Sequence, residues 1–475
     1  MTQTHPDART DARPAPDAGR WRALVLLCLA QFMLIVDVTV VNVALPSIGR
    51  DLSLGRTDLT WVVAAYSLCF GGLLLLGGRL ADTLGRRRAF LTGLAVFTTA
   101  SLASGLAWSG GSLVAGRVAQ GVGAALLSPA ALSIITTTFR GAERRRALGL
   151  WAAIGGGGGA VGVLFGGLLT SGPGWEWVFF INVPIGVTVL ALLPRFVPAA
   201  PGARRPLDVP GALAATATAA SLIFGLVKAG EYGWRDAVTV VPLAVALVGA
   251  LAFVMIERTA RTPLVPLALL RRRTIATGNL VMLAASSLLL ATFFLTSQYL
   301  QNLLSLSAVE TGLVFLPVAL ATAVGAHLSS TLIGRAGTRP VAVTGFALAA
   351  IGLLLLARVP ADGHVLVDVL PGFVVLALGL GAGFVCATTT AMRRVAHREA
   401  GLASGIVNTG HEIGGALGVA LAAALAGTSV GGHTVEGFQT AFGVFAAAAG
   451  VIALLALFLI PAGRPDTGGR PLLAH

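Results

Sequence analysis

The sequence predicts an all-α membrane protein with fourteen transmembrane helices, and two observations carry this prediction. First, the 475 residues are 56% hydrophobic and only 11% charged, with a mean hydropathy of +0.86, whereas a soluble protein carries roughly 25% charged residues. Second, the apolar residues gather into runs of about the 20 residues that a helix needs to cross a bilayer. This composition excludes a soluble enzyme and a soluble DNA-binding protein.

The apolar runs are separated by short polar or arginine-bearing segments. The first run is longer than the apolar core of a signal peptide and is predicted to span. The two weakest candidates are 210–229, rich in Ala and Thr, and 341–357, which is short, so twelve spans is the alternative count. The predicted spans are 24–45, 60–78, 89–107, 112–138, 147–169, 177–197, 210–229, 237–256, 276–300, 312–333, 341–357, 367–391, 402–426 and 438–460.

The basic residues predict the topology, because cytoplasmic loops of membrane proteins carry an excess of Lys and Arg. With the N-terminus inside, most of the 33 basic residues fall in cytoplasmic segments, and the acidic residues show no such bias. Arg117 lies inside a span, and the outer segments hold only Arg50, Arg56, Lys228, Arg235 and Arg358. Both termini are therefore predicted to be cytoplasmic. The net charge of +13 reflects this topology and not nucleic-acid binding.

Other residues exclude further classes of site. A Walker A motif needs Gly-Lys-[Ser/Thr], but the only lysine, Lys228, is followed by Ala229. No ATP site is predicted. Cys28, Cys69 and Cys386 lie inside apolar runs with no disulfide or zinc spacing, and we expect them to be small buried hydrophobic residues. No metal and no cofactor is predicted.

Polar residues inside a bilayer are costly and mark functional sites. Asp37 lies about nine residues, or ~13 Å, below the outer end of the first span near Pro46. Arg117 lies at comparable depth in the fourth span. Burial of a carboxyl group favours its protonated form, whereas a nearby cation favours the charged form. These opposed influences suit a group that gains and loses a proton in each cycle. The alternative is a fixed ion pair that braces two helices.

Glu412 is a second candidate. It lies near the middle of the thirteenth span, beside His411 and with no arginine in its own helix. It is predicted to carry a proton or to pair with a cationic substrate. The alternative is a protonated side chain that is hydrogen-bonded to a neighbouring helix. The predicted proton-coupling set is thus Asp37, Arg117 and Glu412.

A charged turn joins the second and third spans at Gly78–Arg88. A positive-inside loop would explain the arginines alone, but not the spacing of glycines and acid around them. Gly85 permits a tight reversal, and Asp82 can bond to a helix N-terminus or to an arginine. The residues of this predicted cytoplasmic gate loop are Gly78, Asp82, Gly85, Arg86 and Arg87.

With these features the chain resembles the fourteen-span drug:proton antiporters of the major facilitator superfamily, which are multidrug and antibiotic exporters. Four segments of the first half are similar to that family's motifs: Val36–Pro46 in span one, Gly78–Arg88, Arg117–Ala125 in span four and Trp175–Gly186 at the start of span six. In the family, the span-four motif serves proton transfer. The second half matches in span count and over Asn408–Val419. In span five, Val163 follows Gly162 where the family motif has proline, which leaves export versus import open.

The resemblance implies the major facilitator fold, in which two pseudo-symmetric six-helix bundles rock around a substrate site near the midplane. The expected divisions are a disordered tail over 1–20, bundles over 21–198 and 275–460, linkers and an extra helix pair over 199–274, and a tail over 461–475. Polar residues expected to line the substrate cavity are Gln31, Asn42, Tyr66, Gln120, Gln298, Asn408 and His411.

The implied function is proton-driven export of drugs or antibiotics across a bacterial cytoplasmic membrane. One alternative is a proton-coupled carrier of the same fold for a metabolite such as an amino acid, sugar or siderophore. Another is a membrane sensor or intramembrane enzyme, but no metal cluster or nucleophile–base pair supports it. The expected partners are a small-molecule substrate, protons and lipid, without nucleic acid or ATP, and the expected state is a monomer.

Overall fold

A computed structural model shows an all-α chain. It describes residues 18–139, 143, 146–147, 150–151, 161–162, 164–199, 208–260, 263, 265, 267–393, 395, 400–429 and 434–462. The predicted tails before 18 and after 462 lie outside these residues. Most of the predicted fifth span and Val163 lie outside them as well.

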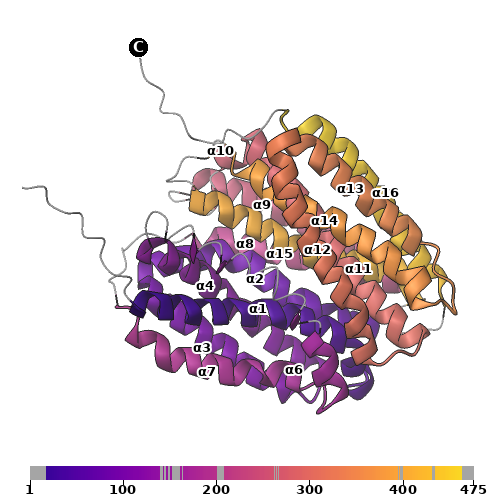
Figure 1. Ribbon diagram of the computed structural model, residues 1–475, viewed down its shortest axis with the longest axis horizontal. Helices are drawn as coiled ribbons and strands as arrows, with labels where there is room; N and C mark the ends of the chain where they lie inside the picture. Colours follow the sequence, from indigo (N-terminus) through magenta and orange to yellow (C-terminus); the bar gives the residue numbers. More distant parts are fainter. Residues whose placement is uncertain are drawn as a thin grey trace, which may run out of the picture.

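The helices of the first half lie side by side, in indigo to magenta, in the lower part of Figure 1. The helix α4 packs on both α2 and α3, and α1 and α3 both contact α7. Close packing at the α3–α4 crossing needs a residue without a side chain, since a Cβ atom at Gly123 would lie 2.6 Å from the backbone nitrogen of Phe97. These elements are α1 (Ala18–Asp51), α2 (Arg56–Leu84), α3 (Arg86–Gly105), α4 (Gly110–Thr138), α6 (Trp177–Phe180), α7 (Asn182–Leu192) and the 3₁₀ turn η1 (Leu193–Arg195).

The second half packs in the same manner, and Figure 1 shows it as the orange and yellow helices. The helix α11 packs on α15 and α14, and α13 packs on α14 and α16. Its elements are α10 (Leu267–Leu270), α11 (Arg273–Gln298), the π-helix η2 (Tyr299–Leu303), α12 (Ala308–Ala336), α13 (Thr338–Leu356), the π-helix η3 (Val365–Val369), α14 (Leu370–Ala391), α15 (Ala400–Ala426), the 3₁₀ turn η5 (Gly427–Ser429) and α16 (Glu436–Leu459).

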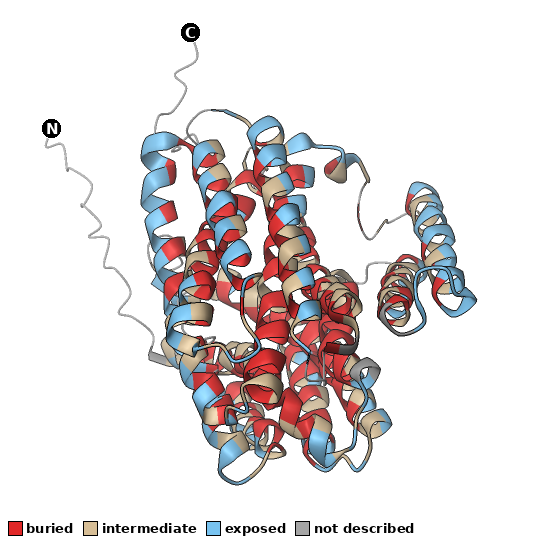
Figure 2. Ribbon diagram, turned by 90° about the vertical axis from the view of Figure 1, so that its right-hand side faces the viewer, coloured by how far each residue is buried: buried red, intermediate tan, exposed pale blue. Residues whose placement is uncertain are grey.

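Between the halves in sequence lie α8 (Val209–Tyr232) and α9 (Ala237–Thr259). The helix α8 packs on both α2 and α15, through an apolar cluster that includes Ala64, Ile223 and Ala416. The helix α9 packs mainly on α8 and exposes most of its apolar side chains. In Figure 2 this pair stands at the right-hand side of the main body. The helix α8 thus covers the seam between α2 and α15.

Twelve helices of the described residues are long and apolar enough to cross a membrane. They correspond to predicted spans one, two, four and six to fourteen. The predicted third span is present as α3, which has three arginines at its start and is not among the twelve. Buried residues gather between the helices, and exposed residues lie on the outward faces (Figure 2). The large apolar residues on these faces fit a protein whose surroundings are lipid.

Candidate proton-coupling site

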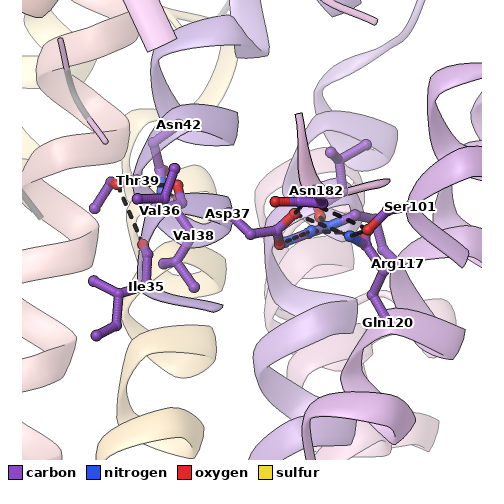
Figure 3. A network of polar contacts seen from close by, with 11 residues as sticks. Ile35, Val36, Asp37, Val38, Thr39, Asn42, Ser101, Arg117, Gln120 and Asn182 are labelled. Atoms are coloured by element: carbon purple, nitrogen blue, oxygen red, sulfur yellow. Dashed lines mark hydrogen bonds and ion pairs between the residues drawn. The ribbon is translucent and has the colours of Figure 1, made fainter. Parts of the chain in front are cut away.

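Asp37 of α1 is buried and accepts hydrogen bonds from three side chains (Figure 3). Arg117 Nη1 donates to Asp37 Oδ2 at 2.5 Å. Gln120 Nε2 and Asn182 Nδ2 donate to Asp37 Oδ1 at 2.9 and 3.0 Å. Both oxygens therefore act as acceptors, as a carboxylate requires. The depth of Asp37 and Arg117 in the sequence correctly suggested that they lie together.

Arg117 is 1% exposed, and its guanidinium is held from several sides. Its Nε donates to the carbonyl oxygen of Val62 at 2.9 Å, and its Nη1 also donates to Gln120 Oε1 at 2.9 Å. The guanidinium carbon lies 4.4 Å from the ring centroid of Tyr66 and 5.9 Å from that of Phe179. A buried cation is stable only when it is paired and hydrogen-bonded, and these contacts meet that need.

Ser101 of α3 completes the cluster, because its hydroxyl accepts from Gln120 Nε2 at 2.8 Å and from Asn182 Nδ2 at 3.4 Å. The Asp37 carboxylate therefore joins α1 to α4 and α7, and the Gln120 and Asn182 amides join α3 to the network. Gln120 is part of this charge network. A proton on Asp37 would replace an acceptor with a donor and weaken the bonds from Arg117, Gln120 and Asn182. The arrangement can thus couple protonation to the packing of α1.

Sequence reasoning missed two members of the site. Asn182 lies within Trp175–Gly186, and Ser101 lies in an ordinary Ala- and Ser-containing stretch of α3. Asn182 could have been found as the polar residue that follows the apolar run 177–181 in that motif. Ser101 gives no such signal, since single serines in membrane helices commonly bond to their own backbone.

Glu412 lies on α15 at the crossing with α2. A Cβ atom at Gly71 would lie 2.5 Å from Glu412 Cβ, so the two helices approach closely there. Glu412 is 8% exposed, and its Oε1 lies 3.3 Å from His411 Nδ1. The His411 ring packs on Phe384, with the ring centroids 5.6 Å apart. Glu412 therefore lies at the seam between the two halves, and no hydrogen bond between described residues joins it to the Asp37 network.

The other predicted cavity residues are spread over both halves. Asn42 donates to the carbonyl oxygen of Val38 in its own helix at 2.8 Å. Gln298 accepts from Asn302 at 2.7 Å. Tyr66 packs on Arg117, and its hydroxyl bonds to no described residue, nor does the Gln31 side-chain oxygen. The partly buried Asn408 lies on α15, one turn before Glu412.

The predicted gate loop is a single-residue turn. The helix α2 ends at Leu84 and α3 begins at Arg86, with Gly85 between them at φ +89°, in the region that glycine favours. Asp82 is exposed and makes no hydrogen bond or ion pair with another described residue. Arg79 of the same segment donates to the carbonyl oxygen of Pro263, which follows α9. The loop thus also touches the chain that leads out of the extra helix pair.

No group of three or more His, Cys, Asp or Glu residues in the described part of the chain could hold a metal ion. The three cysteines are buried and unpaired.

Comparison with known proteins identifies the family. The sequence pattern of the Major Facilitator Superfamily matches residues 27–326 and 275–473. The chain belongs to the major facilitator superfamily. It is a transporter and not an enzyme.

Relatives of this superfamily member include three proteins that are named for resistance to an antibiotic or for its export. The puromycin resistance protein of Streptomyces alboniger is 41% identical over 84% of this chain and 80% of its own length. The cephamycin export protein of Amycolatopsis lactamdurans is 40% identical over 90% of each chain. The lincomycin resistance protein of Streptomyces lincolnensis is 41% identical over 86% of this chain and 85% of its own. The resemblance seen in the sequence motifs is confirmed.

Solved structures confirm the major facilitator fold. An auto-inhibited peptide transporter of the POT family superposes with a TM-score of 0.68, covering 95% of this chain and 99% of that chain at 17% identity. A bacterial homologue of the human lysosomal transporter Spinster gives a TM-score of 0.58, covering 94% and 98%, also at 17% identity. The chain is a multi-pass membrane protein with a small-molecule substrate.

Proposed function

We propose that this protein is a proton-driven exporter of drugs or antibiotics in a bacterial cytoplasmic membrane. The observation that carries the proposal is the buried Asp37–Arg117 pair inside a chain related to resistance and export proteins. A buried ion pair contributes little net stability compared with apolar packing. A role in the transport cycle gives it a reason to exist.

The proposed mechanism is alternating access by bundles over 21–198 and 275–460. Ionised Asp37 binds α4 and α7 through Arg117, Gln120 and Asn182. When Asp37 takes up a proton, these bonds weaken and α1 is freer to shift against its neighbours. One proton that crosses 100 mV releases ~2.3 kcal/mol, and a tenfold gradient costs ~1.4 kcal/mol, so one proton supports roughly fiftyfold accumulation. A proton gradient is therefore a sufficient energy source.

Glu412 is proposed as the substrate-facing acid. Its place at the α2–α15 seam, beside the half-exposed His411, supports this role. A carboxylate at such a seam attracts a cationic substrate more strongly than a neutral one. Hydrophobic compounds with a positive charge are therefore the expected best substrates.

The proposed topology has fourteen spans, with α3 and the fifth span added to the twelve, and both termini in the cytoplasm. The protein is proposed to work as a monomer. Single cysteines at the exposed positions Ser53 and Arg235, in a background that lacks the three native cysteines, test this topology. Both should react with an impermeant thiol reagent from outside. Reaction at position 235 only after permeabilisation would contradict the placement of α8 and α9.

The functional test is drug accumulation in a drug-sensitive bacterial host. Cells that express the protein should accumulate less of at least one compound in a growth-inhibition panel, and a protonophore should abolish the difference. The matched control is the Asp37→Asn variant at equal membrane expression. No drug difference across the panel, with proton-coupled uptake of an amino acid, sugar or siderophore instead, would replace export by the metabolite-carrier function.

A further inference from the structure

The carboxyl-terminal part of α1 contains a proline that breaks its hydrogen-bond ladder. Pro46 has no backbone N–H, so the carbonyl oxygen of Asn42, four residues earlier, loses its helical donor. Asn42 is 1% exposed and lies inside a membrane span. A buried carbonyl in a membrane needs another donor, which a neighbouring helix can supply.

The donors come from the other half of the molecule. Ser297 Oγ of α11 donates to the carbonyl oxygen of Asn42 at 2.9 Å. Gln301 Nε2 of η2 donates to the next carbonyl, that of Val43, at 2.9 Å, and also to Ser297 Oγ at 3.3 Å. Ser297 and Gln301 are both buried. Side chains of the second half therefore bond to the carbonyl that Pro46 leaves without its helical donor and to the carbonyl that follows it.

We propose that Ser297 and Gln301 are positioning residues of the transport cycle, forming a releasable latch that holds the outer ends of the two bundles together. This inference rests on the alternating-access function proposed above. The latch fits that role because its acceptors are on α1 and its donors on α11 and η2, so the bonds must break when these helices separate. Water that enters the gap then satisfies the carbonyls.

The latch shares a helix with the proton site. Asn42 lies five residues after Asp37 on α1, about 7.5 Å along the axis. A shift of α1 at Asp37 is therefore transmitted to the capped carbonyls over little more than one turn. A second hydrogen bond joins the two halves at the same end of the molecule and does not depend on Pro46. The Val309 N–H at the start of α12 donates to Ser171 Oγ at 3.2 Å.

The test measures the separation of the outer ends directly. Spin labels are placed by Ser53→Cys and Ala361→Cys in the cysteine-free full-length protein in lipid nanodiscs. Both sites are exposed, and the bond from Tyr299 Oη to the carbonyl of Pro360 places the second label beside the end of α11. Double electron–electron resonance then measures the distance between the two labels and reports the populations with these ends apart and together.

The latch predicts that Ser297→Ala raises the ratio of open to closed populations by roughly three- to tenfold. Ser297→Thr keeps the hydroxyl group and should leave the ratio near that of the unsubstituted protein. The matched control is Ser286→Ala on the same helix, whose buried hydroxyl bonds to no described residue. It should not change the ratio. Gln301→Leu is a second variant that should act in the same direction as Ser297→Ala.

A double-mutant cycle separates a latch from general packing. Pro46→Ala restores a backbone N–H that can bond to the Asn42 carbonyl within α1. In that background Ser297→Ala should no longer raise the open population. The same rise in both backgrounds, or no rise in either, would overturn the latch. Because no drug is involved in this readout, a failed export assay would overturn the proposed function while leaving the distance result intact.

Discussion

Two buried acids of this transporter, Asp37 and Glu412, sit in very different surroundings. Asp37 is fully buried within one half and is bonded by donors from α4 and α7, with the Arg117 cation among them. Glu412 lies at the seam between the halves, and His411 is its only described partner at 3.3 Å. The first site holds its carboxylate with three donors, whereas the second leaves its carboxyl group with a single neighbouring side chain. Under the roles proposed above, proton coupling uses a pre-organised site, whereas substrate recognition uses a site with few fixed partners.

The largest expected effect comes from removing the cation of the first site. Arg117→Ala leaves the Asp37 carboxylate buried without its ion-pair partner, which costs about 3–5 kcal/mol. We expect a large fall in thermal stability in detergent together with loss of export. Arg117→Lys keeps the charge but cannot reproduce both the Val62 and the Gln120 bonds. It should therefore recover much of the stability but little of the transport. Full export by Arg117→Ala would show that the pair has no coupling role.

A smaller effect is expected from Asn182, one of the two network members that the sequence did not reveal. Asn182→Ala removes one donor to a charged group, a loss of about 1.5–3 kcal/mol. Proton-coupled export should fall and the melting temperature should drop moderately. The control is Thr98→Val, since Thr98 is buried beside α7 and its hydroxyl bonds to no described residue. Equal losses for both variants would indicate a general packing effect at α3–α7.

The second site should respond to the charge of the substrate. Glu412→Gln removes the seam's negative charge with little change in shape, so export of cationic compounds should fall more than export of neutral ones. A matched pair of compounds that differ in charge, measured at equal protein levels, gives this ratio. An equal loss for both compounds would contradict substrate pairing and favour a purely conformational role for Glu412.

The smallest effect on stability is expected in the gate loop. Asp82 is exposed, so Asp82→Asn should change stability by no more than about 0.5 kcal/mol. Because it acts at the predicted cytoplasmic gate, it should slow turnover while substrate binding stays unchanged. Asp51→Asn, at an exposed acid that ends α1, is the control. Weakened binding with normal turnover per bound substrate would rule out the gate role.

The sequence predicts the buried ion pair of the first site better than it predicts the other residues that form the site. The depths of Asp37 and Arg117 are readable because each span fixes the position of a residue along the membrane normal. Which faces of α3 and α7 point toward the site depends on helix rotation, which composition does not encode. The places of Ser101 and Asn182 in the site, and the bond from the Gln120 amide to Asp37, therefore need the three-dimensional structure.

The fold was predictable for a similar reason. Apolar run length fixes where helices begin and end to within a few residues, so α8 and α9 appear where the Ala- and Thr-rich run and its neighbour lie. The contact of α8 with both α2 and α15 was not predictable, since it depends on small complementary surfaces such as Gly72 against Thr216. The bond between Ser297 and the Asn42 carbonyl likewise needs the three-dimensional structure.

The most direct test of proton coupling through Asp37 is proton movement in sealed proteoliposomes on addition of an exported drug. The unsubstituted protein, Asp37→Asn, Glu412→Gln and the double variant are compared at equal reconstitution, with drug binding measured in parallel. The account predicts substrate-driven proton flux in the unsubstituted protein and its loss in Asp37→Asn, which still binds the drug. Normal proton flux in Asp37→Asn would contradict the account.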